Sequence, residues 1–102
     1  MSDKTQVPTP GRVYLDGYLD VPEERWAEVR EGLAEHITLT HAEPGCIKFE
    51  VVPCPDVERR LLVSEIFQDR QAFDAHQDRT KASPWAQISE GIPRHYSLRT
   101  EE

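Results

Sequence analysis

The stretch Arg60–His76, RLLVSEIFQDRQAFDAH, changes its hydrophobic period midway, and this change constrains the fold more than any other feature of the chain. From Leu61 to Phe67 the residues are mainly aliphatic and aromatic, which is typical of a strand buried on both faces. From Asp69 onward the pattern fits a short helix that ends near Gln77. The Asp69 carboxylate can accept hydrogen bonds from the free N–H groups of the first turn. The stretch therefore predicts one complete strand–helix unit.

The predicted helix of this unit carries a histidine toward the core. Phe73 and His76 are three residues apart and therefore share one helical face. Ala72 lies beside them, so this face is predicted to look inward. An imidazole on an apolar helix face is either a packed core histidine or a candidate catalytic group.

A strand is predicted over residues 12–20, where apolar and polar positions alternate. Gly17 leaves a gap on the apolar face. A β-bulge is the favoured explanation, and the close approach of another backbone or of a ligand is the alternative. The opposite face carries Tyr14, Asp16 and Tyr18.

A helix is predicted to follow, because Pro22 suits a first turn and glutamates come directly after it. It is expected to run to about Thr40 or His41 and to stop at Glu43-Pro44-Gly45, since Pro44 disfavours helical geometry in the residue before it. Its apolar stripe consists of Trp26, Val29, Leu33 and Ile37.

The second strand is predicted over residues 46–52, with Ile47, Phe49 and Val51 on one face and charged residues on the other. Prolines at 53 and 55 force a turn, so the strand that begins at Arg60 is expected to pair with it as an antiparallel hairpin.

The rest of the chain completes the pattern. A polar break is predicted at residues 78–82, a short helix from Ser83 to about Glu90, and a last strand over residues 95–100. The order β-α-β-β-α-β predicts a ferredoxin-like α+β fold with both main helices on one sheet face. The other face would remain uncovered, so a homodimer with sheets packed face to face is expected.

Bulk properties limit the function. The 102 residues suit one domain, residues 12–102, after a flexible N-terminal arm of residues 1–11. The net charge of −7, with twelve scattered basic residues, argues against nucleic-acid and anionic-membrane partners. No segment has the apolar length of a membrane span. Cys46 and Cys54 lack the spacing of a zinc site, and a cytoplasmic protein with reduced thiols is expected.

Several of these residues together resemble a known family, the antibiotic biosynthesis monooxygenase domain. Glu43-Pro44-Gly45-Cys46 comes first, then a hairpin, then Glu65 with an aromatic residue two positions later. Asp69 and the run Ala72–His76 complete the set. The resemblance spans roughly residues 12–100 and implies the dimeric α+β barrel fold. It also implies oxygenation of quinols, anthrones or related phenols with O₂ and without metal or flavin.

The same resemblance implies roles for individual residues. His76 matches the helix histidine of the family and Glu65 the strand glutamate, so both are candidate catalytic residues. Phe67 occupies a position where many members have tryptophan, and Ala82 one where some have a second histidine. Haem-degrading members use that tryptophan and an asparagine, and this chain has no asparagine, which argues against haem degradation. The candidate substrate-binding residues are Phe67, Phe73, Thr80, Trp85 and Tyr18.

The chemistry of His76 fits this reading, since an imidazole titrates near neutral pH and can accept a phenolic proton. Glu65 could orient His76 or a substrate hydroxyl, or could instead form a structural pair with Arg60 or Arg94. Trp26 is expected in the core, whereas Trp85, in the segment after Thr80, could belong to a lid over the pocket.

A metal site is not expected. His36 and His41 are five residues apart on one helix, so they point in different directions, and no carboxylates complete a ligand set with them. These two residues and His95 are predicted to be exposed.

Two alternatives to the monooxygenase remain open. One is a non-catalytic dimeric module that binds a small aromatic ligand. The other is an isomerase acting on a metabolite that resembles a sugar phosphate, which the lack of a basic cluster or a glycine-rich loop disfavours.

Overall fold

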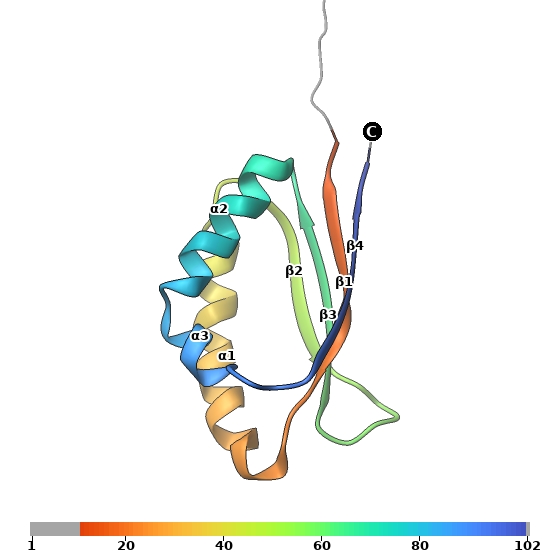
Figure 1. Ribbon diagram of the computed structural model, residues 1–102, viewed down its shortest axis with the longest axis vertical. Coiled ribbons are helices and arrows are strands. Elements are labelled where there is room, and N and C mark those ends of the chain that lie inside the picture. The colour runs from red at the N-terminus through yellow and green to blue at the C-terminus, as the bar shows by residue number, and fades with distance from the viewer. Residues whose placement is uncertain (1–10, 102) are drawn as a thin grey trace, which may run out of the picture.

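The computed structural model describes residues 11–101, which form a layer of helices on a twisted sheet (Figure 1). Of the predicted N-terminal arm, residues 1–10 lie outside the described part. The elements, in chain order, are β1 (Val13–Asp20), the 3₁₀ turn η1 (Glu23–Arg25), α1 (Trp26–His41), β2 (Cys46–Pro53), β3 (Arg60–Phe67), α2 (Arg70–Lys81), α3 (Pro84–Ile88) and β4 (Arg94–Thr100).

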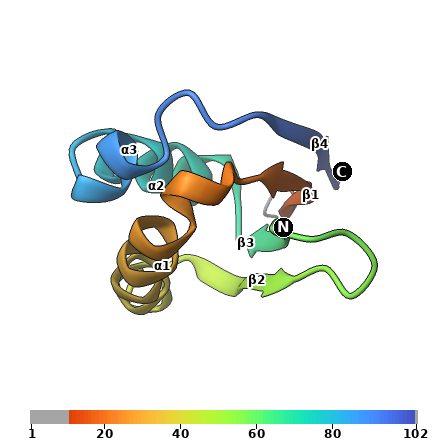
Figure 2. The ribbon, with the colours of Figure 1, turned by 90° about the horizontal axis from the view of Figure 1, so that it is seen from below.

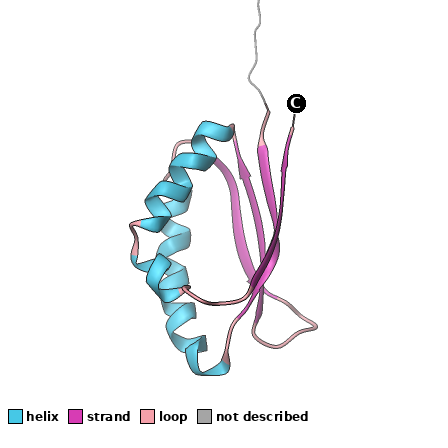
Figure 3. Cartoon of the chain, in the orientation of Figure 1, coloured by secondary structure: helices cyan, strands magenta, loops and turns pink. Residues whose placement is uncertain are grey.

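The sheet has the order β2-β3-β1-β4, and all neighbouring strands are antiparallel. The helices lie on one side of it (Figures 2 and 3). This arrangement confirms the predicted ferredoxin-like α+β fold and the β2–β3 hairpin. Within residues 11–101, no helix covers the other face of the sheet.

The core fills the space between the two layers. Every second residue of β3 points toward the helices, so Leu61, Val63 and Phe67 are buried there. Val29 and Leu33 of α1 pack against them, as the predicted stripe requires. Each fully buried aliphatic or aromatic side chain contributes roughly 1.5–3 kcal/mol. The prediction that β3 is buried on both faces is wrong for the single chain, because Leu62 is exposed on the outer face.

The favoured explanation for Gly17 is also wrong. Both ladders run through it without a bulge, since Gly17 pairs with Val63 on one side and Tyr96 on the other. A Cβ atom at this position would lie 2.0 Å from the carbonyl oxygen of His95. The close approach of the β4 backbone therefore requires glycine here.

A bulge occurs instead in β2, where the register shifts between Cys46 and Lys48. The extra residue turns Ile47 to the outer face, so its side chain is 48% exposed while that of Phe49 is 5% exposed. The prediction that Ile47 and Phe49 share a face fails because a bulge breaks the two-residue period.

Helix boundaries differ modestly from expectation. Pro22 precedes a 3₁₀ turn rather than the α-helix itself, which begins at Trp26 and ends at His41, as predicted. α2 continues four residues beyond the predicted end at Gln77. Its last turn contains basic residues, which suit the negative end of the helix dipole.

No helix within residues 11–101 combines the length and the apolar character that a membrane span requires. Cys46 and Cys54 are both free thiols and half-buried.

Candidate functional site

His76 is brought to the core by α2. The Asp69 carboxylate accepts a hydrogen bond from the Ala72 N–H at 2.8 Å, which confirms the predicted N-cap. With the helix started there, Phe73 and His76 face the sheet, and His76 is only 3% exposed. Its ring centroid lies 4.9 Å from that of Phe67 and 5.6 Å from that of Phe49. Aromatic side chains from two strands thus enclose the imidazole.

The partner of His76 is Glu43, which begins the Glu-Pro-Gly turn. His76 Nδ1–H donates to Glu43 Oε1 at 3.0 Å. Arg79 donates to the other carboxylate oxygen through Nε, and its second nitrogen donates to the Thr40 hydroxyl at 3.0 Å. Glu43, rather than Glu65, is therefore the carboxylate that holds Nδ1 of His76. The Glu43 carboxylate fixes the proton on Nδ1 and leaves the lone pair on Nε2.

The environment of His76 favours the neutral ring. Burial lowers the pKa of His76 below its usual value of 6.5, and the Glu43 carboxylate offsets part of this effect. The histidine is therefore an unprotonated imidazole at neutral pH. The adjacent carboxylate can stabilise the imidazolium that forms when Nε2 accepts a proton.

Glu65 is a second buried ionisable group. It is 8% exposed, and burial raises its pKa to about 7, with repulsion from Glu43 adding to the shift. Neither proposed arginine partner reaches it. Arg60 forms an ion pair with Asp20 at 2.7 Å, and Arg94 donates to the Ser89 carbonyl at 2.7 Å.

His36 was predicted to be exposed, and this prediction is wrong. It is 5% exposed, its ring stacks on Trp85 with centroids 5.2 Å apart, and it lies 5.8 Å from His76. Burial lowers the pKa of His36 to about 4. Its Nδ1 has no hydrogen-bond partner among residues 11–101.

A signal for the burial of His36 was present in the sequence. His36 comes three residues after Leu33 and seven after Val29, on the apolar stripe of α1.

Two hollows meet at Trp85. The inner cavity, of about 30 Å³, has His36, Phe49, Glu65 and Trp85 among its lining residues. This volume suits a single water molecule. The outer pocket, of about 240 Å³, is lined by Gln77, Thr80, Lys81, Trp85, Ala86, Ser89 and Arg94.

The predicted residue Thr80 is one of the residues that line the outer pocket. Its hydroxyl oxygen is buried and lacks a hydrogen-bond partner within the described chain. An unpartnered hydroxyl beside a pocket can bind a ligand oxygen or a water.

Tyr18 is the one predicted site residue that lies apart. It is on the outer face of the sheet, where the Arg60 guanidinium carbon lies 3.8 Å from its ring centroid and His95 lies 4.9 Å away. The other candidates lie on the helix side of the sheet.

The remaining histidines, His41 and His95, are exposed as predicted. In the described part of the chain, no group of three or more His, Cys, Asp or Glu residues could hold a metal ion.

Comparison with solved structures identifies the fold. A conserved protein of unknown function from Bacteroides thetaiotaomicron superimposes with a TM-score of 0.73 at 19% identity, over 89% of this chain and 98% of that one. A "putative antibiotic biosynthesis monooxygenase" from Nitrosomonas europaea gives a TM-score of 0.72 at 16% identity, over 91% and 92%. A conserved protein from Methanosarcina mazei gives a TM-score of 0.73 at 19% identity, over 90% of this chain and 94% of that one. No curated protein matched the chain.

Comparison with protein families gives the affiliation. The model of the family described as antibiotic biosynthesis monooxygenase matches residues 12–87. This span runs from the start of β1 into α3 and includes Glu43, Glu65 and His76. The chain therefore belongs to the antibiotic biosynthesis monooxygenase family.

Proposed function

We propose that this protein is a monooxygenase that uses O₂, without a metal or organic cofactor, on a small quinol or phenol. The observation that carries the proposal is the Glu43–His76 pair, in which a carboxylate at 3.0 Å orients a neutral, buried imidazole among aromatic rings. Family membership supports the reaction class.

His76 Nε2 accepts the phenolic proton of the substrate, and Glu43 stabilises the resulting imidazolium. Phe67 and Phe49 keep water away from the ring and provide flat apolar surfaces for an aromatic substrate. A phenolate in such a dry site is far more electron-rich than the phenol. Removing one proton therefore activates the substrate.

The phenolate then transfers one electron to O₂, and the phenoxyl radical and superoxide combine at a ring carbon. The peroxide takes back the proton held by His76, and its O–O bond breaks as the ring C–H proton leaves. One oxygen atom becomes a new carbonyl of a quinone and the other leaves as water. The substrate supplies both hydrogens and all the electrons, so no external reductant is needed.

Substrate entry requires Trp85 to move. The inner cavity of about 30 Å³ is too small for an aromatic ring, whereas the outer pocket of about 240 Å³ approaches the size of small-molecule sites. Trp85 lines both, on a helix of only five residues. Displacement of α3 would join the two hollows, with Thr80 in the lining of the outer pocket and Glu65 in the lining of the inner cavity.

The test is O₂ consumption with a panel of hydroquinones. His76→Ala is expected to lower the rate by about 100-fold or more, because general-base catalysis contributes that much. Asp78→Ala is the control, since Asp78 is exposed on the same helix and lines neither hollow. Equal O₂ uptake by His76→Ala and the wild-type protein would show that His76 is only a packing residue and would favour the non-catalytic binding module.

The outer pocket supports a second candidate function. Lys81 and Arg94 place two positively charged residues in the lining of this pocket. An isomerase acting on a phosphorylated metabolite would use such a pocket as its phosphate anchor. Binding of inorganic phosphate that is lost in Lys81→Gln, without any O₂ uptake by the wild-type protein, would favour this candidate.

A further inference from the structure

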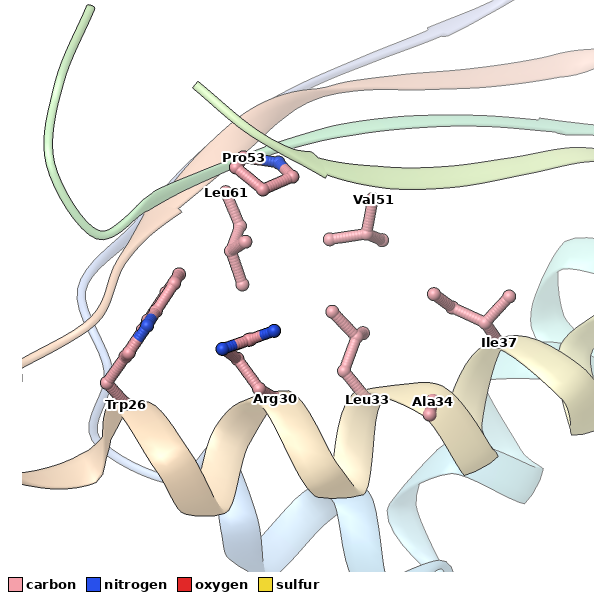
Figure 4. A pocket seen from close by; sticks show the side chains of 8 residues that line it. All are labelled: Trp26, Arg30, Leu33, Ala34, Ile37, Val51, Pro53 and Leu61. Atoms are coloured by element: carbon pink, nitrogen blue, oxygen red, sulfur yellow. The ribbon is translucent and has the colours of Figure 1, made fainter. Parts of the chain in front are cut away.

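A third hollow, called the groove below, lies between α1 and the end of the β2–β3 hairpin (Figure 4). Its volume is about 270 Å³, larger than the outer pocket at Trp85. Leu33 and Val51 line both this groove and the inner cavity, so the two are separated by side chains only. The groove is lined by Trp26, Arg30, Leu33, Ala34, Ile37, Val51, Pro53 and Leu61.

Arg30 is the one charged residue of this lining. Figure 4 shows its guanidinium in the groove between Trp26 and Leu33, and its central carbon lies 5.9 Å from the Trp26 ring centroid. Between residues 11 and 101, no carboxylate forms an ion pair with it.

The sequence explains why Arg30 lacks a carboxylate on its own helix. The positions three and four residues away on either side are Trp26, Ala27, Leu33 and Ala34. The strands opposite contribute Val51, Pro53 and Leu61, which carry no charge. In a chain with nineteen acidic and twelve basic residues, this guanidinium is available for an anion from outside.

We propose that this groove binds a small aromatic carboxylate. A guanidinium can hold a carboxylate through two parallel hydrogen bonds, and the indole of Trp26 offers a flat face for the ring. The other walls are aliphatic, so they suit the apolar remainder of such a molecule. A phosphate would place unpaired oxygens against Val51 and Leu61, which is unfavourable.

Binding is expected to be weak and to depend on salt. The net charge of −7 repels anions at a distance, and only one cation opposes it. A ligand of about nine non-hydrogen atoms such as benzoate should bind with a Kd of about 1 mM at low salt.

The test is a titration of the ¹⁵N-labelled full chain with sodium benzoate, followed by NMR. The indole N–H of Trp26 and the Nε–H of Arg30 should shift in a saturable manner, while the indole N–H of Trp85 should remain in place. Benzamide, which has the same shape without the charge, should bind about tenfold more weakly.

Two variants locate the site. Arg30→Gln should weaken benzoate binding about tenfold, and Ala34→Leu should abolish it by filling the groove from an exposed helix position that leucine tolerates. Arg99→Gln is the matched control, because Arg99 also lies over an aromatic ring, Tyr14, but outside the groove. Thermal unfolding would verify that each variant is folded.

Three results would overturn the proposal. The first is equal benzoate affinity of Arg30→Gln and the wild-type protein. The second is equal affinity for benzamide and benzoate. In the third, the Trp26 and Arg30 signals would move on dilution of the protein but not with benzoate, which would mean that a second copy of the chain covers the groove.

Discussion

At the scale of single residues, burial has the largest effect on the pKa values of His36, His76 and Glu65. It lowers the pKa values of His36 and His76 and raises that of Glu65, so each group is pushed toward its neutral form. Only His76 has a carboxylate at hydrogen-bond distance, Glu43, which opposes that effect. Of the two buried histidines, His76 is therefore the one whose protonated form a neighbouring carboxylate stabilises.

Glu65→Gln should change how stability depends on pH. The pKa of Glu65 is raised to about 7 from 4.5, so the unfolded chain releases this proton at a lower pH than the folded chain. The stabilisation due to Glu65 is complete below about pH 4.5 and is lost as the pH rises through about 7. The free energy of unfolding of Glu65→Gln minus that of the wild-type protein should therefore increase by roughly 2 kcal/mol from pH 5 to pH 8.

Urea unfolding at both pH values would measure this difference. His36 has the opposite pH dependence, since its pKa is lowered to about 4, but both proteins share it and it cancels in the comparison. Identical pH dependence of the two proteins would mean that Glu65 is not desolvated in the folded chain.

At the scale of elements, α2 positions the site. It begins at the Asp69 cap and continues to Lys81, so that Phe73, His76 and Arg79 all lie on the side that faces the rest of the chain. The last turn is stabilised from outside the helix, because Arg79 binds Glu43 and Thr40. This contact comes from residues far away in the sequence, which explains why the local pattern predicted an earlier end.

Asp69→Ala should destabilise the protein by about 1 kcal/mol, because the Ala72 N–H loses its acceptor. For a domain of this size, the expected fall in the melting temperature is about 4–8 °C. Differential scanning calorimetry would measure it. Asp74→Ala is the control, since the exposed Arg70–Asp74 pair should contribute only about 0.3–0.5 kcal/mol. Equal effects of the two substitutions would argue against capping as the role of Asp69.

At the scale of the whole molecule, the sheet face opposite the helices is apolar in part. Val52 and Leu62 are neighbours across the β2–β3 ladder, Tyr18 pairs with Leu62 on the other side, and Ile47 lies on the same face because of the bulge. A row of aliphatic and aromatic side chains on an uncovered sheet is typical of an interface. We therefore retain the prediction that two copies associate through this face.

Leu62→Glu should shift a dimer toward monomers, because a carboxylate at the centre of the interface would lose its water without gaining a partner. Sedimentation velocity over a range of concentrations would measure the shift. Leu39→Glu is the matched control, since Leu39 is exposed to a similar degree but lies on α1 in the helical layer. A dimer unaffected by Leu62→Glu, or a wild-type monomer at high concentration, would contradict the prediction.

Much of the fold was predictable from local patterns. Strands, helices and the Asp69 cap follow from hydrophobic period and turn residues, which act over a few positions of the chain. The errors at Ile47 and Gly17 have one physical cause. A bulge or a close backbone approach depends on the neighbouring strand, and the sequence of one strand contains little information about it.

The sequence by itself determined the ferredoxin-like order of elements and the inward direction of Phe73 and His76, because these depend on periodicity within single segments. The tertiary structure alone decided the partner of His76. Glu43 precedes it by 33 positions and reaches it only because the turn before β2 folds against α2. It likewise placed His36 against Trp85 and left Arg30 in an apolar groove, since contacts between distant segments depend on how the layers pack.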